Sequence, residues 1–357
     1  MAGVYISYPF CAQKCTYCNF ASGVFPRELE SRYLDVLLAE LRGAEWRWTP
    51  ETVYLGGGTP SQLAGDALGS ILAAVPGREW AEATIEAAPG GLTVEKVAAW
   101  RGAGINRVSL GVQSFVQKEL VRTGRRHTAE IVEQEIGLLR AAGIESISVD
   151  LIAGLPGQTE ASWAQSLDWV ERLGVPHVSV YMLEVDEDSR LGRELLVLGS
   201  RYGAGDVPGE DAIADFYETA VERLARLGIE RYEISNFARA GFESRHNLKY
   251  WRREPYLGFG ADAHSFDGTM RWQNPESAAD YVEAPGAIER VAAEPLSESF
   301  FLGLRLREGI ESGGFANVVE RFVQDGLLER AGERVRLTPR GVLLSNEVFA
   351  EFIQPAG

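Results

Sequence analysis

Short runs rich in β-branched and aromatic residues alternate with longer stretches whose apolar positions recur every three or four residues. The short runs predict β-strands, and the longer stretches predict amphipathic helices. The predicted strands are Val4–Ser7, Thr52–Leu55, Thr84–Ala87, Arg107–Gly111, Ser146–Ile152, His177–Leu183 and Arg231–Ser235. The predicted helices are Glu28–Arg42, Ser61–Ala74, Val94–Arg101, Ala129–Ala142, Ala161–Leu173 and Asp211–Leu227. This alternation indicates an α/β fold of βαβ units with a parallel sheet, either doubly wound or closed into a complete or partial barrel.

The pattern changes after Asn236, where an aromatic and glycine-rich stretch runs to about Phe266. A second pattern begins at Ser297. It predicts helices at Glu298–Leu304 and Phe315–Gln324, a strand at Arg334–Leu337 and a last helix from Pro339. We therefore expect three units, residues 1–240, 241–296 and 297–357, the last of them an α+β domain that resembles a winged helix and packs as a lid.

Composition narrows the class of protein. Of the 357 residues, 45% are apolar and 24% are charged, which is typical of a soluble globular protein. No stretch approaches the ~20 apolar residues of a transmembrane segment, and the N-terminus lacks the pattern of a secretory signal, so we expect a cytoplasmic protein. The net charge of −16 excludes nucleic acid as a partner, since it would repel a polyanion.

The cysteines carry the most specific chemistry. All three lie within eight residues, directly after the first predicted strand: Cys11, Cys15 and Cys18. An odd, clustered set does not suit a disulfide framework. Three thiolates on one loop can hold three irons of a cubane cluster and leave the fourth iron open. A structural zinc site would need a fourth Cys or His, and the first histidine is His127. The spacing favours an iron–sulfur cluster, with zinc or inert thiols as the alternatives.

Polar or glycine residues also follow successive predicted strands. The glycines of Gly56–Pro60 have no side chains, so the backbone of this stretch can approach a ligand closely. Glu86 and Gln113 end the third and fourth strands, and Arg125 offers a planar guanidinium suited to a carboxylate. Asp150 lies among apolar neighbours, where hydroxyl partners such as a ribose diol would offset its burial. Each residue alone is more often structural, but together at strand ends they predict a ligand site.

The cysteine spacing, with Tyr17 before the last Cys, resembles the radical S-adenosylmethionine (SAM) superfamily. That resemblance implies a partial (β/α)6 TIM-like barrel over residues 1 to about 240 and a [4Fe–4S] cluster whose open iron binds SAM. The strand-end motifs are similar to those of the oxygen-independent coproporphyrinogen III oxidase-like subfamily. By position in that subfamily, the residues of the SAM pocket would be Tyr5, Tyr17, Gly57, Gly58, Thr59, Glu86, Gln113, Arg125 and Asp150.

Three features resemble the heme chaperone branch of that subfamily, HemW, instead of the dehydrogenase. Phe20 stands where the dehydrogenase has a fourth Cys, and the sequence begins at the first strand without a long extension. The stretch His246–Trp251 matches the H-N-x-x-Y-W motif of the branch. One departure is Ser7, where many relatives have His.

The resemblance implies a protein that binds heme and delivers it to an acceptor protein. Heme iron binds an axial nitrogen ligand, and apolar side chains contact the faces of the macrocycle. The candidate heme residues are therefore His246, Asn247, Tyr250 and Trp251. His264 and Met182 are further candidate ligands. Another possibility is that His246 caps a backbone group and Trp251 fills the core. The alternative functions are a dehydrogenase that oxidatively decarboxylates a porphyrinogen and a zinc-stabilised binding protein.

Overall fold

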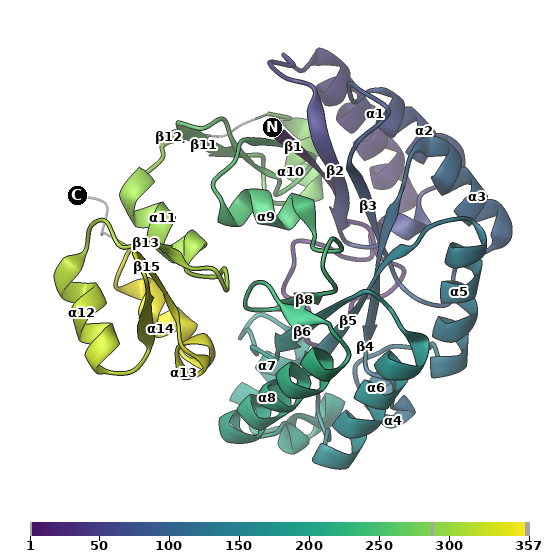
Figure 1. Cartoon of the computed structure of the whole chain (residues 1–357). Helices are drawn as coiled ribbons and strands as arrows, with labels where there is room; N and C mark the ends of the chain where they lie inside the picture. Colours follow the sequence, from purple (N-terminus) through teal and green to yellow (C-terminus); the bar gives the residue numbers. More distant parts are fainter. Residues whose placement is uncertain (1, 287–288, 354–357) are drawn as a thin grey trace.

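A computed structural model describes residues 2–286 and 289–353; the few remaining residues of the three predicted units lie outside it. Six parallel strands form its centre, side by side in chain order. They are β1 (Ala2–Tyr8), β2 (Pro50–Gly57), β3 (Glu82–Ala87), β4 (Arg107–Gln113), β5 (Ser146–Ala153) and β6 (His177–Met182). Figure 1 shows these strands curving into an open barrel. The predicted partial (β/α)6 barrel is therefore confirmed.

The helices between these strands cover the outside of the barrel (Figure 1). They are α1 (Arg27–Gly43), η1 (Pro60–Gln62), α2 (Gly65–Ala73), α3 (Val94–Ala103), α4 (Gln117–Arg122), α5 (Ala129–Ala141) and α6 (Glu160–Leu173). Strand β6 is followed by α7 (Arg190–Leu196), η2 (Arg201–Asp206) and α8 (Glu210–Arg226). Helix α6 illustrates why they form: Thr159 closes a capping box at its start, and Gly174 ends it with φ 59°. Trp163 and Leu167 lie one turn apart on its buried face. No helix in the described part of the chain is long and apolar enough to cross a membrane.

The two faces of the barrel strands carry different side chains. On β1, Val4 and Ile6 are fully buried in the hydrophobic core with the outer helices. Tyr5 lies between them in sequence and therefore faces the opposite side, where its ring stacks on Tyr54 of β2 with centroids 6.1 Å apart. The core thus lies between sheet and helices, and the inside of the barrel is lined by aromatic and polar groups.

The predicted seventh strand, Arg231–Ser235, is wrong. In its place β7 (Glu230–Arg231) and β8 (Asn236–Ala238) form an antiparallel hairpin at the edge of the sheet. Between the two strands the carboxylate of Glu233 accepts the backbone N–H of Ser235 at 3.0 Å. This local side-chain bond closes a turn where the β-rich residues alone would favour an extended strand.

The predicted connecting segment contains more structure than its sequence suggests. Its elements are α9 (Arg245–Trp251), β9 (Tyr256–Phe259), β10 (His264–Phe266), β11 (Met270–Gln273), α10 (Ala278–Glu283) and β12 (Arg290–Ala292). Strand β9 pairs in parallel with β1, and β10, β11 and β12 continue the same sheet as antiparallel strands. Within the described residues the sheet therefore has twelve strands, and β12 and β7 form its two edges.

The C-terminal unit is a small α+β domain. It contains α11 (Pro295–Gly303), β13 (Ile310–Glu311), α12 (Ala316–Gln324), β14 (Leu328–Ala331), β15 (Arg334–Leu337), α13 (Pro339–Leu343) and α14 (Ser345–Ala350). Its strands form an antiparallel sheet in the order β13-β15-β14, which confirms the predicted winged-helix-like pattern. The domain lies across the open side of the barrel (Figure 1). On one side, Leu306 forms an isolated β-bridge with Glu233. On the other, the carboxylate of Glu298 forms ion pairs with Arg253 and Arg271.

Candidate functional site

The cysteine loop leaves β1 at the carboxyl end of the barrel strands. Its three thiols are free and partly buried. The N–H of Cys11 donates to the carbonyl of Gly23 at 2.8 Å, and the N–H of Thr16 donates to Thr123 after α4 at 3.3 Å. The carbonyl of Thr16 accepts the N–H of Leu191 in α7 at 2.8 Å. These bonds attach the loop to two neighbouring segments, so the thiols are held in a fixed position.

The chemistry of the donor set bears on the two metal interpretations. Within residues 2–286 and 289–353, no three His, Cys, Asp or Glu side chains are arranged to hold a single metal ion. A zinc site needs its ligands around one point, whereas a cubane cluster takes each thiolate on a different iron. Burial raises the pKa of the Cys18 thiol, and a bound metal would favour its thiolate form. The donor set fits a cubane cluster better than zinc.

A cavity of about 180 Å³ lies beside the loop and brings together residues from distant parts of the chain. Its lining residues are Tyr5, Ser7, Pro9, Phe20, Ala21, Ser22, Gly57, Glu86, Ala261 and Asp262. Three residues of the predicted SAM pocket, Tyr5, Gly57 and Glu86, are among them. Ser7, the departure from the family pattern, and Phe20, one of the features shared with the chaperone branch, also line this cavity. Both residues therefore belong to one site.

Glu86 is the buried acid of this cavity. The hydroxyl of Tyr54 donates to its Oε1 at 2.8 Å, and burial raises the pKa of Glu86 to about 7. A nearby positive charge would favour the ionised form of this carboxyl group. The pair therefore suits a cationic ligand group. Sequence reasoning missed Tyr54, although its position two residues before Gly56 places it on the inner face of β2.

Asp150 has a different environment from the one expected. Three hydroxyls of the protein donate to its carboxylate: Ser179 at 2.7 Å, Ser109 at 2.9 Å and Ser148 at 3.2 Å. Burial raises its pKa, and these hydrogen bonds offset part of the cost. The predicted hydroxyl partners are therefore present, but the protein supplies them from β4, β5 and β6. Asp150 lies outside the lining of the 180 Å³ cavity.

Arg125 approaches the cysteine loop from the other side of the barrel mouth, which is the end of the barrel formed by the carboxyl ends of the strands. Its Nη1 donates to the carbonyl of Gly111 at 2.8 Å and its Nη2 to the hydroxyl of Tyr17 at 3.4 Å. Burial alone would lower its pKa, but Tyr17 and Cys15 beside it raise the pKa above its ordinary value. Its Nε is buried without a partner in the described structure. This orphaned donor fits a carboxylate placed next to the cluster loop.

Gln113 and the glycine-rich turn shape the backbone of the mouth. Gln113 adopts φ 70° at a bulge between β4 and β5. The N–H of Gly58 donates to Tyr8 at 2.8 Å, and that of Thr59 donates to Phe10 at 2.9 Å. A Cβ at Gly58 would lie 2.7 Å from the Phe10 carbonyl oxygen. Gly58 and Thr59 therefore connect the turn to the start of the cysteine loop, while Gly57 lines the cavity.

His246, the first candidate heme ligand, lies inside the barrel toward the amino ends of the strands, where its ring stacks on Tyr54 with centroids 5.2 Å apart. Its exposure is 0%. Its Nδ1 lies 2.8 Å from the hydroxyl of Thr52 and its Nε2 lies 2.7 Å from the hydroxyl of Tyr250. Thr52 and Gly3, which its ring approaches, are near the amino ends of β2 and β1. An iron at His246 would have to displace one of these two bonds.

The rest of the H-N-x-x-Y-W motif holds α9 in place. The carboxylate of Glu82 accepts the backbone N–H groups of Arg245 and His246 at 3.0 and 2.9 Å. The N–H of Asn247 bonds to the capping hydroxyl of Ser244. Trp251 packs under the guanidinium of Arg305, 4.4 Å from the ring centre. The motif therefore connects the amino end of the barrel to the C-terminal domain.

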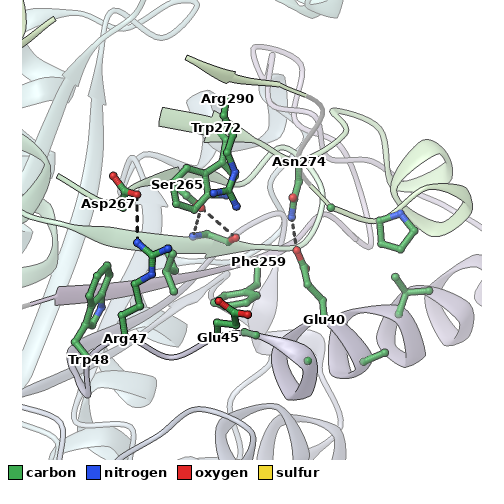
Figure 2. A pocket seen from close by; sticks show the side chains of 18 residues that line it. Glu40, Glu45, Arg47, Trp48, Phe259, Ser265, Asp267, Trp272, Asn274 and Arg290 are labelled. Carbon is green, nitrogen blue, oxygen red and sulfur yellow. Dashed lines mark hydrogen bonds and ion pairs between the residues drawn. The ribbon is translucent and has the colours of Figure 1, made fainter. Parts of the chain in front are cut away.

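A larger cavity of about 630 Å³ lies on the outer face, between α1 and the strands β9 to β12. Figure 2 shows Trp48, Phe259 and Trp272 along it, with Arg47 and Arg290. No His, Cys or Met is among its lining residues in the described part of the chain. Nothing in the sequence pattern predicted this groove, because its walls are brought together by strands that the sequence analysis did not anticipate.

Comparison with known proteins identifies the family. The model of the radical SAM superfamily matches residues 5–170, and that of the HemN C-terminal domain matches residues 292–344. Proteins named heme chaperone HemW are similar over nearly the whole chain. The one from Bacillus subtilis is 33% identical over 99% of both chains, and the one from Mycobacterium tuberculosis is 36% identical over 97% of this chain and 93% of its own.

Among solved structures, coproporphyrinogen III oxidase (HemN) from Escherichia coli, described as a radical SAM enzyme, superposes with a TM-score of 0.83. The match covers 98% of this chain and 89% of that one at 20% identity, which shows a common fold. The sequence similarity to the HemW proteins extends through both the barrel and the C-terminal domain. This chain belongs to the HemW family within the radical SAM superfamily.

Proposed function

We propose that this protein is a heme chaperone, which binds a [4Fe–4S] cluster, SAM and heme and delivers the heme to an acceptor protein. Membership of the radical SAM superfamily implies the cluster and SAM. The observation that carries the proposal is the mouth of the barrel, where Phe20 lines the same cavity as Tyr5 and Glu86, next to the cysteine loop. An exposed aromatic ring at this position suits an apolar macrocycle.

Different residues bind the cluster and the charged groups of SAM. Cys11, Cys15 and Cys18 hold the cluster, which, together with SAM, supplies one-electron chemistry when bound. The unpartnered Nε of Arg125 receives the carboxylate of SAM. Glu86 receives a cationic group of SAM at the end of β3. The other predicted pocket residues, Tyr5, Tyr17, Gly57, Gly58, Thr59, Gln113 and Asp150, shape the walls around these two charged ends.

The choice of chaperone over dehydrogenase rests on Phe20 and on the similarity to HemW. The dehydrogenase branch has a further Cys where this chain has Phe20. The HemN structure supports the fold alone at 20% identity, whereas the HemW proteins are similar at 33–36% identity. Heme is therefore proposed as cargo, with a heme-binding protein as its acceptor.

One anaerobic experiment tests this function. The cluster is reconstituted on the full chain, and the same sample is titrated with heme, mixed with apomyoglobin as a generic acceptor, and assayed with coproporphyrinogen III. The proposal expects stoichiometric heme binding, transfer to the acceptor and no vinyl product. Vinyl product at a catalytic rate, or the absence of heme binding, would overturn it.

A further inference from the structure

The 630 Å³ cavity on the outer face of the sheet, hereafter the outer groove, is separate from the site proposed for the cluster and SAM. None of the residues proposed to bind either of them is part of its described lining. Its size is typical of small-molecule sites, which measure about 300–1,000 Å³. One wall is α1, where the lining residues Val36, Ala39 and Gly43 lie three and four positions apart and therefore share one face. The strands β9 to β12 form the opposite wall (Figure 2).

Aromatic rings from three different segments line the outer groove. Trp48 lies between α1 and β2, Phe259 is on β9 and Trp272 is on β11. Figure 2 shows these three side chains along the groove. The wall formed by α1 is open, because a Cβ at Gly43 would meet no atom within 4 Å. Rings that border an open space in this way suit a large, flat and mainly apolar ligand.

Hydrogen-bond donors that can receive carboxylates also line the outer groove. The guanidinium of Arg290 lies over the ring of Trp272, 4.4 Å from its centre, because the two residues pair across β11 and β12. Arg290 forms no ion pair with any described residue. Arg47 is exposed, and its Nη1 is 3.7 Å from the carboxylate of Asp267. The Nε1 of Trp48 is buried without a partner in the described structure. A ligand with carboxylates would satisfy these donors.

Three acidic side chains also line the outer groove, and the protein already binds two of them. The carboxylate of Asp267 accepts two backbone N–H groups of the turn that follows it, at 2.9 and 2.8 Å. The carboxylate of Glu40 accepts the amide of Asn274 at 2.8 Å, and burial raises the pKa of Glu40. The third acid, Glu45, is exposed. Its charge opposes an anionic ligand, so its removal provides a test of the ligand's charge.

We propose that the outer groove holds the cargo heme, with the macrocycle against Trp48 and Trp272, its carboxylates toward the two arginines, and no iron ligand from this chain. This inference rests on the proposed function and names the part of the chain that holds the cargo. No His, Cys or Met is part of the described lining, so the axial positions of the iron stay open. An acceptor's histidine can then bind the iron without first breaking a bond between the iron and this protein.

The mouth of the barrel is the competing location, because the ring of Phe20 is 67% exposed there. The cavity at the mouth is smaller, about 180 Å³, and its described lining contains Glu86 and Asp262 but no Lys or Arg. Both size and charge therefore favour the outer groove for a macrocycle with carboxylates. Phe20 still distinguishes the chaperone branch, because it stands where the dehydrogenase has a cysteine.

The test compares single variants of the full chain with its cluster reconstituted. Each is titrated anaerobically with ferric heme and with metal-free protoporphyrin IX. The unaltered chain should bind one equivalent of either probe with similar affinity, and the bound heme should lack the spectrum of imidazole-ligated iron. Gly43→Leu fills part of the groove and should weaken the binding of both probes about tenfold or more. Gly137→Leu on α5 is the matched control, because a Cβ there also meets no atom within 4 Å.

Two further variants test the rings and the charge of the groove. Trp272→Leu should weaken the binding of both probes about tenfold. Its matched control is Trp169→Leu on α6, because the guanidinium of Arg172 lies 4.5 Å from the centre of that ring in a similar arrangement. Glu45→Gln removes a negative charge and should tighten the binding of both probes about two- to fivefold at low salt. A merely structural role of the groove would not produce tighter binding.

The outcomes separate this inference from the proposed function. If the unaltered chain binds no heme, both fail. If it binds heme, and Gly43→Leu and Trp272→Leu bind heme as their controls do, the inference alone is overturned. An imidazole-ligated spectrum, or binding of heme but not of protoporphyrin IX, would place the iron on a histidine and would also overturn it. So would loss of heme binding in Phe20→Ser with unchanged groove variants. Glu45→Gln keeps the inference testable if Gly43→Leu folds poorly, which circular dichroism detects.

Discussion

The Nε2 atom of His246 lies 2.7 Å from the hydroxyl oxygen of Tyr250, one turn later on α9 and inside the barrel. This bond and the bond from Nδ1 to Thr52 fix the helix against the first two strands. The H-N-x-x-Y-W stretch is therefore placed to stabilise the amino end of the barrel.

Replacing this histidine should consequently lower stability. The His246→Ala variant removes two buried hydrogen bonds and leaves a void, which we expect to lower the free energy of unfolding by about 2–4 kcal/mol. Urea unfolding followed by circular dichroism measures this change, with His264→Ala as the exposed control. An unfolding midpoint equal to that of the unaltered protein would contradict the structural role.

Buried histidines should also make the fold sensitive to acid. Desolvation lowers the pKa of His246 to about 3 and that of His127 to about 4, whereas both are about 6.5 in an unfolded chain. Between pH 6.5 and 4 the unfolded chain binds protons that the folded chain excludes, so stability falls as the pH falls. The urea midpoint should drop from pH 7 to pH 5, and the drop should be smaller in His246→Gln. An equal drop in that variant would show that other groups cause it.

Glu86 should make SAM binding depend on pH in a known direction. Its pKa of about 7 means that the carboxyl group is ionised above neutrality and protonated below it. A cationic ligand prefers the ionised form, so SAM affinity should fall as the pH drops from 8 to 6, by up to about tenfold per pH unit. Calorimetric titration of the reconstituted protein measures the trend. Glu86→Gln should bind more weakly at pH 8 and show a flatter pH profile; an unchanged profile would remove Glu86 from the site.

Cluster content should depend on Gly58. A Cβ at this position would meet the Phe10 carbonyl oxygen at 2.7 Å and push the glycine-rich turn away from the cysteine loop. Gly58→Ala should therefore hold less than half of the iron and sulfide of the unaltered protein after reconstitution. Gly69→Ala is the matched control, because a Cβ there meets no atom within 4 Å. Equal iron in the two variants would show that the turn and the loop are not coupled.

The sequence predicted the parts of the fold whose signals are local. Six barrel strands have long apolar or alternating runs, and the three cysteines lie on one loop. The strands β9 to β12 gave no such signal because each has only three or four residues, and residues with positive φ, such as Gly260 and Asp262, separate β9 from β10. The helix predicted from Ser61 begins later, at Gly65, after a single 3₁₀ turn.

The site was predictable to the extent that its residues end successive strands. Gly57 and Glu86 line one cavity, because parallel strands place their ends at one edge of the sheet. The contact between Tyr54 and Glu86 joins residues 32 positions apart, and the three serines around Asp150 come from three strands. Such contacts depend on which strands become neighbours and on how the strands tilt in the barrel. They therefore cannot be predicted from the identity of a single residue.

Delivery of heme from the reconstituted protein is the most direct test of the central claim. The full chain with its cluster is loaded with one equivalent of heme and mixed anaerobically with excess apomyoglobin, and the acceptor's Soret band is followed over time. The account predicts transfer faster than from free heme aggregates, with no vinyl product when coproporphyrinogen III replaces heme. Catalytic turnover of coproporphyrinogen III, or a failure to bind or release heme, would contradict it.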